Sequence, residues 1–164
     1  MSEFGELADK FLQACARRRI LAATAESCTG GMIISALTDI PGSSSVVDRG
    51  FITYSNDAKI EMLGVSPVTL DAYGAVSRET AMEMANGALS RSHAAIALAV
   101  TGIAGPDGGS EEKPIGLVWF GLAETGRQVL AERHIFENRG RDFVRREAVR
   151  TALLMGLEAL GRES

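Results

Sequence analysis

Two hydrophobic patterns recur along this chain, one typical of helices and the other typical of buried strands. Apolar side chains three or four positions apart, which predict amphipathic helices, occur in residues 4–19, 32–38, 57–64, 77–90 and from about 142 onward. Short apolar or β-branched runs, which predict strands, occur at residues 20–24, 46–55, 94–100, 115–123 and 128–136. Residues 66–74 contain Pro67, and we expect an irregular connection there.

The order of these segments predicts the fold class. Strands alternate with helices in the first part of the chain, an order typical of a sheet covered on both faces. The run at residues 94–100 is apolar at every position and predicts the central strand. Only residues 124–127 separate the last two strands, which predicts an antiparallel hairpin. We therefore expect residues 1–164 to form a single α/β domain, a three-layer α/β/α sandwich with a mixed, mostly parallel five-stranded sheet.

Composition narrows the classes of function. The chain has 164 residues, of which 46% are hydrophobic, enough for a substantial core. Its formal net charge of −4, with one Trp and two Tyr, argues against binding to nucleic acid. The sequence has no long apolar run and no signal-peptide pattern, so we expect a cytoplasmic protein without a membrane partner. Cys15 and Cys28 have neither the number nor the spacing of a zinc site, and we expect no metal.

A strand-to-helix junction carries the first candidate chemistry. The strand at residues 20–24 is followed by Ser27, and Gly30 and Gly31 precede the next helix. Glycines at such a junction let the backbone turn sharply and let a ligand approach closely, while the first helical amides lack partners. Ser27 is therefore either a helix cap or a nucleophile, and the local sequence leaves both open.

Two further strands are expected to bring hydroxyl groups to the same place. Tyr54 and Thr101 stand at the ends of the second and third predicted strands, and a glycine-rich loop at residues 103–110 follows Thr101. If these strands run parallel to the first, their carboxyl ends share one edge of the sheet, where α/β proteins of this kind bind ligands. Lys59 lies one helical turn beyond Tyr54 and would reach that edge as well.

This set of residues predicts a serine nucleophile activated without histidine. His93 is expected at the opposite edge of the sheet and His134 inside the hairpin, so a Ser-His-Asp triad does not fit. A lysine with a lowered pKa can take the proton of Ser27 instead, and Tyr54 can relay it. The alternative interpretation of Lys59 is an ordinary solvated lysine. The backbone amides that would stabilise the oxyanion are those of Thr29, Gly30 and Gly31.

Five motifs in order along the chain resemble the C-terminal domain of the CinA (competence/damage-inducible) family. They are residues 25–31 (AESCTGG), 54–59 (YSNDAK), 74–77 (GAVS), 101–109 (TGIAGPDGG) and 113–116 (KPIG). The resemblance implies an α/β/α fold and the hydrolysis of nicotinamide mononucleotide to nicotinic acid mononucleotide and ammonia. It also implies no cofactor and a homodimer as the oligomeric state. Longer members of the family carry a preceding nucleotide-processing domain, so only the amidase activity is expected here.

The resemblance also assigns roles to residues. Its nucleophile, tyrosine and lysine fall on Ser27, Tyr54 and Lys59. The positions that we expect to bind the nucleotide substrate are Thr29, Gly30, Gly31, Asn56, Thr101, Gly102, Gly105 and Arg141. We expect the substrate phosphate to bind either the glycine-rich loop or Arg141, and the sequence leaves open whether Arg139 or Arg141 matches the arginine of the family.

Two alternatives stay open at this point. The chain is either an amidase or a catalytically silent module that binds a nucleotide or a partner in competence or the response to DNA damage. Within the amidase interpretation, Cys28 is a rival nucleophile beside Ser27. Because side chains alternate along an extended strand, we expect Cys28 to point into the packing beneath the helix when Ser27 faces the substrate.

Overall fold

The computed structural model describes residues 2–162 and contains the helices and strands that the hydrophobic pattern predicts, with one addition. Its helices are α1 (Gly5–Arg18), α2 (Met32–Thr38), α3 (Asn56–Leu63), α4 (Pro67–Tyr73), α5 (Arg78–Ser90) and α6 (Arg141–Leu160), with a short 3₁₀ turn, η1 (Ser43–Ser45). Its strands are β1 (Ala22–Glu26), β2 (Val47–Ile52), β3 (Ile96–Gly102), β4 (Leu117–Glu124) and β5 (Leu130–Ile135). Among the described residues, no helix combines the length and hydropathy needed to cross a membrane.

The five strands form one mixed sheet in the order β2-β1-β3-β4-β5. Strand β1 pairs in parallel with both β2 and β3, whereas β4 is antiparallel to β3 and to β5. The predicted hairpin and the central place of β3 are therefore confirmed. Because β1, β2 and β3 run in the same direction, their carboxyl ends lie at one edge of the sheet.

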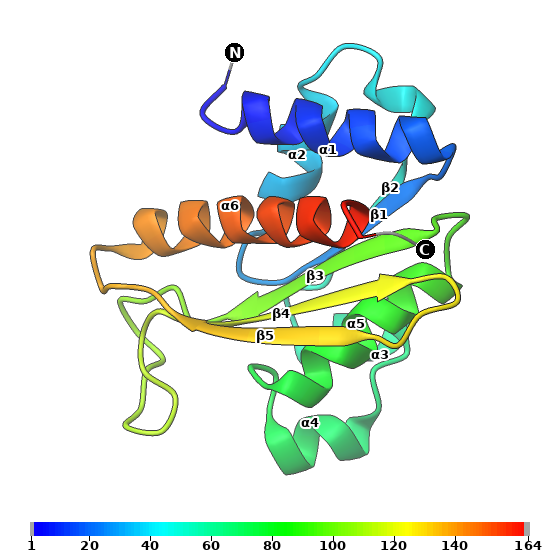
Figure 1. Cartoon of the computed structure of the whole chain (residues 1–164). Coiled ribbons are helices and arrows are strands. Elements are labelled where there is room, and N and C mark those ends of the chain that lie inside the picture. The colour runs from blue at the N-terminus through cyan, green and yellow to red at the C-terminus, as the bar shows by residue number, and fades with distance from the viewer. Residues whose placement is uncertain (1, 163–164) are drawn as a thin grey trace.

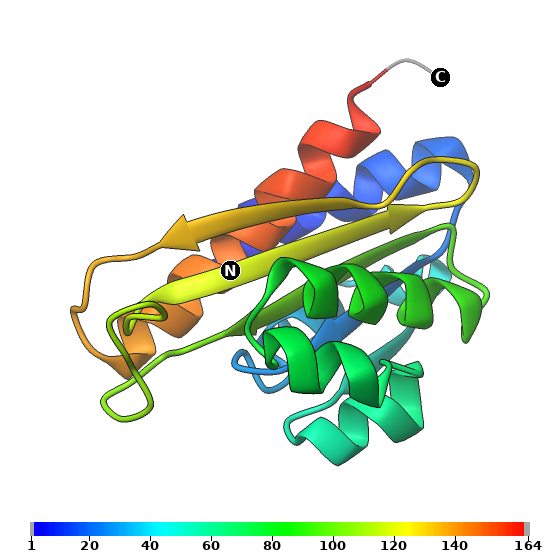
Figure 2. The same cartoon turned by 90° about the horizontal axis from the view of Figure 1, so that it is seen from below.

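Helices cover both faces of the sheet, as the three layers in Figure 1 and Figure 2 show. Helices α1, α2 and α6 lie on one face, and α3, α4 and α5 lie on the other. The side chains of β3 alternate between the two layers, because Ile96, Leu98 and Val100 join the core beneath α1, α2 and α6. Ala97 and Ala99 face the smaller core beneath α5. The large side chains of β3 thus pack on one side of the sheet, and its alanines pack on the other side.

Small residues let α5 approach the sheet closely. At Gly121 in β4, an added Cβ would collide with the backbone carbonyl of Ala81 in α5. A glycine is therefore required there for space, since its backbone conformation is not one that excludes other residues.

Helix α4 corrects the sequence-based prediction of an irregular connection at residues 66–74. Pro67 stands at the first helical position, where its fixed φ suits the helix and its missing N–H is not needed. The Ser66 hydroxyl accepts a hydrogen bond from the Val68 amide at 3.2 Å and caps the helix. Glu83 of α5 holds the same turn by accepting from the Ser66 amide and the Thr69 hydroxyl. The serine-proline pair is thus a helix start.

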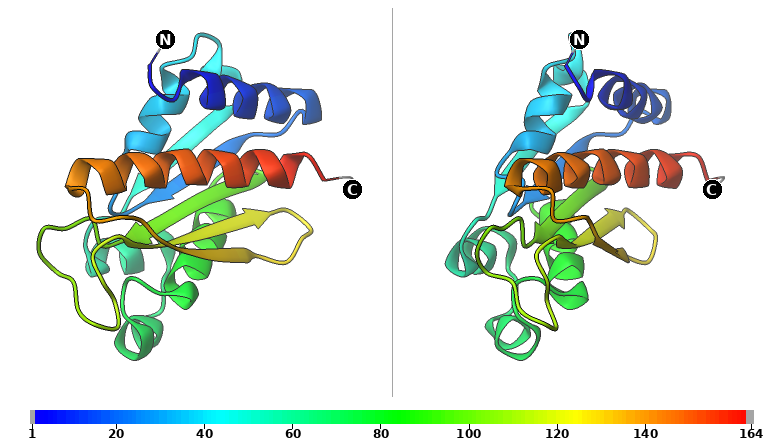
Figure 3. Two further views of the ribbon diagram at one scale, coloured as in Figure 1. Left: turned by 60° about the vertical axis from the view of Figure 1, so that its left-hand side comes forward. Right: turned by 90° about the vertical axis from the view of Figure 1, so that its left-hand side faces the viewer.

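The loop between β3 and β4, residues 103–116, lies at the same end of the molecule as the start of α6 (Figure 1 and Figure 3). Arg141, the first residue of α6, donates to the Gly105 carbonyl at 2.8 Å and joins the two. The carboxyl ends of the parallel strands, this loop and the start of α6 therefore surround one region of the molecule.

Candidate active site

A tight turn holds Ser27 between β1 and α2. We call residues 27–31 the Ser27 loop. Gly30 and Gly31 have φ values of +58° and +104°, a region that favours glycine over residues with a side chain. The Gly30 amide donates to the Ser27 carbonyl at 3.0 Å, and the Ser27 amide donates to Val100 of β3 at 3.0 Å. These bonds place the Ser27 hydroxyl at the carboxyl edge of the sheet.

Lys59 of α3 contacts that hydroxyl directly. Its Nζ donates to Ser27 Oγ at 2.9 Å and to the Thr53 carbonyl at 2.9 Å, and the Tyr54 carbonyl lies 3.5 Å away. The Lys59 side chain is almost wholly buried, with 1% of its surface exposed. Burial disfavours the charged form and lowers the pKa of Lys59 from 10.5 to about 8. The alternative of a solvated surface lysine does not fit this position.

The surroundings of Lys59 Nζ suit an amine that accepts a proton from serine. A neutral amine has two N–H donors and one lone pair. The two carbonyls of Thr53 and Tyr54 are acceptors only, so they take the two N–H groups. The lone pair is then left for the third neighbour, the hydroxyl of Ser27. In the charged form, Nζ donates to all three oxygens.

Tyr54 presents its phenol on the other side of the site. This residue is exposed, and its hydroxyl oxygen accepts a hydrogen bond from Arg141 Nη2 at 2.8 Å. Among the described residues, the contact between Tyr54 and Lys59 runs through the Tyr54 carbonyl and not through the phenol. Since its oxygen accepts from a guanidinium, the phenol has its own proton left to donate.

These groups line a cleft of about 220 Å³. Of the predicted site residues, it is lined by Ser27, Tyr54, Asn56, Lys59, Thr101, Gly102 and Arg141. Cys28, Ala75, Val76 and Ala104 complete the lining. The Thr101 hydroxyl donates to the Ala75 carbonyl at 2.8 Å, which leaves its oxygen as an acceptor toward the cleft. Gly105 contributes through its carbonyl, which holds Arg141.

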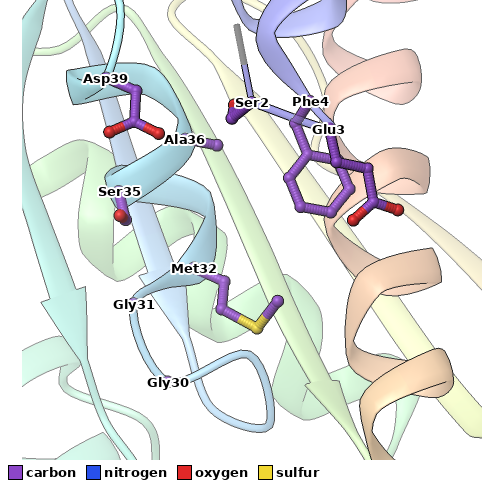
Figure 4. Close-up of a pocket in the computed structure, with 9 residues that line it drawn as sticks. All are labelled: Ser2, Glu3, Phe4, Gly30, Gly31, Met32, Ser35, Ala36 and Asp39. Carbon is purple, nitrogen blue, oxygen red and sulfur yellow. The ribbon is translucent and has the colours of Figure 1, made fainter.

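The structure does not bring Thr29, Gly30 and Gly31 into this cleft. The Thr29 hydroxyl is buried and donates to Glu26, and the Gly30 amide is bonded to Ser27. Gly30 and Gly31 instead line a second hollow of about 480 Å³ between α2 and residues 2–4, which Figure 4 shows. In that view the side chains of Phe4 and Met32 project into the hollow. The turn of the Ser27 loop therefore separates the two glycines from the cleft.

Arg139 and Arg141 have different surroundings in the structure. Arg141 lines the cleft, whereas the Arg139 guanidinium lies over the ring of Phe143, 4.5 Å from its centroid. Arg141 therefore lines the cleft, and Arg139 is not among its lining residues.

Sequence reasoning missed two charged residues that hold the Ser27 loop. Glu26 is fully buried and accepts from the Thr29 hydroxyl at 2.7 Å and from the amides of Ile33 and Ile34 at 2.9 and 3.0 Å. Arg145 of α6 donates to the carbonyls of Cys28 and Thr29. The available signals were a carboxylate at the end of an apolar strand, and the spacing of four between Arg141 and Arg145, which puts both on one helix face.

Cys28 follows Ser27 and contributes to the lining of the cleft, but most of its side chain is buried. Its side chain is 6% exposed and belongs to the core beneath α1, α2 and α6. Burial raises the pKa of the Cys28 thiol to about 12, so the reactive thiolate is scarce at neutral pH.

The histidines belong to other parts of the fold. The ring of His134 stacks on Phe136 and meets Phe120 edge-on, and the His93 amide donates to Asp48. Within residues 2–162, no group of three or more His, Cys, Asp or Glu side chains is placed to hold a metal ion.

A protein-family model and several named proteins match most of this chain. The model of the family described as the CinA C-terminal domain matches residues 5–160. A protein of Escherichia coli (strain K12) named nicotinamide-nucleotide amidohydrolase PncC is 49% identical over 152 residues, which are 93% of this chain and 92% of that protein. A protein of the same name from Enterobacter agglomerans is 54% identical over 140 residues, 85% of this chain and 82% of the relative.

Solved structures resemble the whole chain. The crystal structure of competence/damage inducible protein CihA from Agrobacterium tumefaciens has a TM-score of 0.94 and 52% sequence identity, covering 99% of this chain and 98% of that one. A structure from Klebsiella pneumoniae, described as competence damage-inducible protein A (ComA), has a TM-score of 0.93 at 36% identity and covers 99% of this chain and 100% of that one.

Proposed function

This chain belongs to the CinA C-terminal domain family, and from that premise we propose that it is an amidohydrolase that converts nicotinamide mononucleotide to nicotinic acid mononucleotide and ammonia. The substrate follows from relatives named nicotinamide-nucleotide amidohydrolase. The observation that carries the proposal is the 2.9 Å contact between Ser27 Oγ and the amine of a buried lysine. A serine with such a neighbour is a nucleophile suited to a carboxamide.

In the first half of the reaction, Ser27 forms an ester with the substrate. Neutral Lys59 takes the hydroxyl proton as Ser27 Oγ attacks the carboxamide carbon, and the C=O electron pair moves to the oxygen. The tetrahedral intermediate then collapses, the C–N bond breaks, and the Lys59 ammonium supplies the proton with which ammonia leaves.

The second half returns the enzyme to its starting state. Water attacks the acyl carbon while neutral Lys59 accepts one of its protons. The C–O bond to Ser27 breaks, and the Lys59 ammonium returns the proton to Ser27 Oγ. The pKa of about 8 lets one group act as base and acid in turn near neutral pH.

Other residues of the cleft orient the substrate. The phenol of Tyr54 has its proton free to donate, because its oxygen accepts from Arg141, and we assign it to the substrate carbonyl as oxyanion-stabilising donor. The Thr101 hydroxyl donates its proton to the Ala75 carbonyl, so its oxygen is suited to accept a hydrogen bond from the carboxamide NH₂. Asn56 and the unused N–H groups of Arg141 remain for the ribose and phosphate.

The test is ammonia release from nicotinamide mononucleotide by the purified chain, with product identity checked by mass. We expect turnover by the unmodified protein, and at least about a thousandfold lower kcat for Ser27→Ala. A protein that binds the nucleotide with full occupancy but releases no ammonia would instead be the silent binding module, and the amidase proposal would be lost.

A further inference from the structure

Arg145 of α6 reaches the backbone immediately after the nucleophile. Its Nε donates to the Cys28 carbonyl at 3.0 Å, and its Nη2 donates to the Thr29 carbonyl at 3.3 Å. The side chain is half-buried, and an added Cβ at Gly30 would lie 3.3 Å from the same Nη2. The guanidinium therefore lies against three consecutive residues of the Ser27 loop. Arg145 is not among the residues that line the cleft.

The Ser27 loop needs such a restraint. Its two consecutive glycines give the backbone more conformational freedom than other residues would. Glu26 fixes the far end of the loop by bonding Thr29 and the first amides of α2. The carbonyls of Cys28 and Thr29, in the middle of the loop, both accept hydrogen bonds from Arg145.

We propose that Arg145 is a positioning residue, which holds the Ser27 loop in the conformation that keeps Ser27 Oγ in contact with Lys59 Nζ. This role rests on the proposed function of Ser27 but involves no contact between Arg145 and the substrate. Small displacements of a nucleophile lower the rate strongly because the reacting atoms must be held within narrow distances. Arg145 therefore acts on the chemical step and leaves substrate binding to the cleft.

The kinetic test replaces Arg145 while keeping its aliphatic length. Arg145→Met is expected to lower kcat by about 10- to 100-fold with KM changed less than about threefold. Arg145→Lys, which keeps the charge and one donor, should recover part of the loss. The matched control is Arg146→Met on the same helix, because Arg146 pairs with exposed Asp142 and Glu3, and its kcat should stay within about twofold.

A second measurement needs no substrate. Cys28 lies inside the Ser27 loop, so its alkylation by iodoacetamide reports how well the loop is held. Cys15, buried in α1 with a pKa also raised to about 12, reports the rest of the fold. In Arg145→Met, we expect Cys28 labelling, followed by peptide mass, to become at least about tenfold faster while Cys15 labelling stays unchanged.

These two measurements separate the proposal from the assignment of function. An unchanged Cys28 rate in Arg145→Met overturns the positioning role whatever the kinetics are, and so does an equal acceleration at both cysteines, because that indicates general loosening. If the unmodified protein released no ammonia, the proposed function would fail while the labelling result would still decide whether Arg145 holds the loop.

Discussion

The proposed role of Lys59 depends on its burial, which lowers its pKa. The pKa of about 8 means that the neutral, proton-accepting form dominates only above that pH. Below it, kcat/KM is expected to fall by about tenfold per pH unit, and above it to level off, because one deprotonation activates the base. A pH–rate profile of ammonia release measures this directly.

The matching substitution is Lys59→Arg. A guanidinium cannot lose its proton at these pH values, so this variant is expected to be nearly inactive from pH 6 to about 10. Near-normal turnover by this variant would remove Lys59 as the base. In the unmodified protein, a profile that rises only near pH 10.5 would contradict the lowered pKa of Lys59.

Cys28 is the residue that separates serine from thiol chemistry. Its buried thiol belongs to the core, so Cys28→Ala is expected to keep most activity and to lower the free energy of unfolding by about 1–2 kcal/mol. Brief iodoacetamide treatment of the unmodified protein should leave activity intact. If Cys28→Ala were inactive and Ser27→Ala active, the nucleophile would be the thiol.

At the scale of single residues, the sequence singles out side chains with distinctive chemistry but not those whose role depends on their partners. Ser27 and Lys59 follow from a glycine junction and from the scarcity of histidine. The role of Glu26 depends on amides seven and eight positions later meeting its carboxylate. The prediction of a sharp turn at Gly30 and Gly31 agrees with their positive φ angles. The local sequence does not reveal that the two glycines line the second hollow and not the cleft.

Among the elements, the close approach of α5 to β4 gives the sharpest stability prediction. In Gly121→Ala the new methyl would meet the carbonyl of Ala81, so helix or strand must shift. We expect the free energy of unfolding to fall by about 2–4 kcal/mol, as for overpacking or worse. Urea unfolding measures this.

The control for that substitution is Gly161→Ala. Gly161 has φ −79°, and an added Cβ there would have its nearest neighbours at 3.5 Å, ordinary contact. Its stability should change by less than about 0.5 kcal/mol. Equal effects at both positions would mean that the close packing of α5 is not what Gly121 provides.

Helix α4 shows why element boundaries were harder to predict than element types. Its seven residues are too few for a clear periodicity, and Pro67 favours an irregular connection. The helix exists because Ser66 caps it and Glu83 of α5 binds its first turn. The Ser66 cap can be predicted from the local sequence, whereas the contact with Glu83 depends on tertiary structure.

At the scale of the whole molecule, the parallel pairing of the first three strands agrees with the prediction from the sequence. The contacts that α6 makes with the cleft were not predicted. Three strand ends meet at one edge because β1 pairs with both β2 and β3. Arg141 then ties Tyr54, beyond β2, to Gly105 in the loop after β3. The pairing follows from alternating elements, but the registry of α6 over the sheet depends on packing across the full chain.

Arg141 accordingly supports a prediction at this scale. Arg141→Met removes the partner of the Tyr54 phenol and the anchor of the 103–116 loop, so kcat/KM for nicotinamide mononucleotide should fall by about 100-fold. Arg139→Met, which loses the stack on Phe143 outside the cleft, should retain activity within about threefold. Equal effects of the two variants would contradict the placement of Arg141 in the site.

The position of α6 has a consequence for the order in which function is acquired during synthesis. Ser27 and Lys59 are 32 positions apart in the sequence, and the Ser27 amide donates to Val100, so their contact can form once β3 has been synthesised. The partners of Tyr54 and Cys28 arrive from residues 87 and 117 positions later. A nascent or truncated chain that ends before α6 therefore contains Ser27 and Lys59 but neither arginine, and we expect it to gain full activity only after α6 has been added.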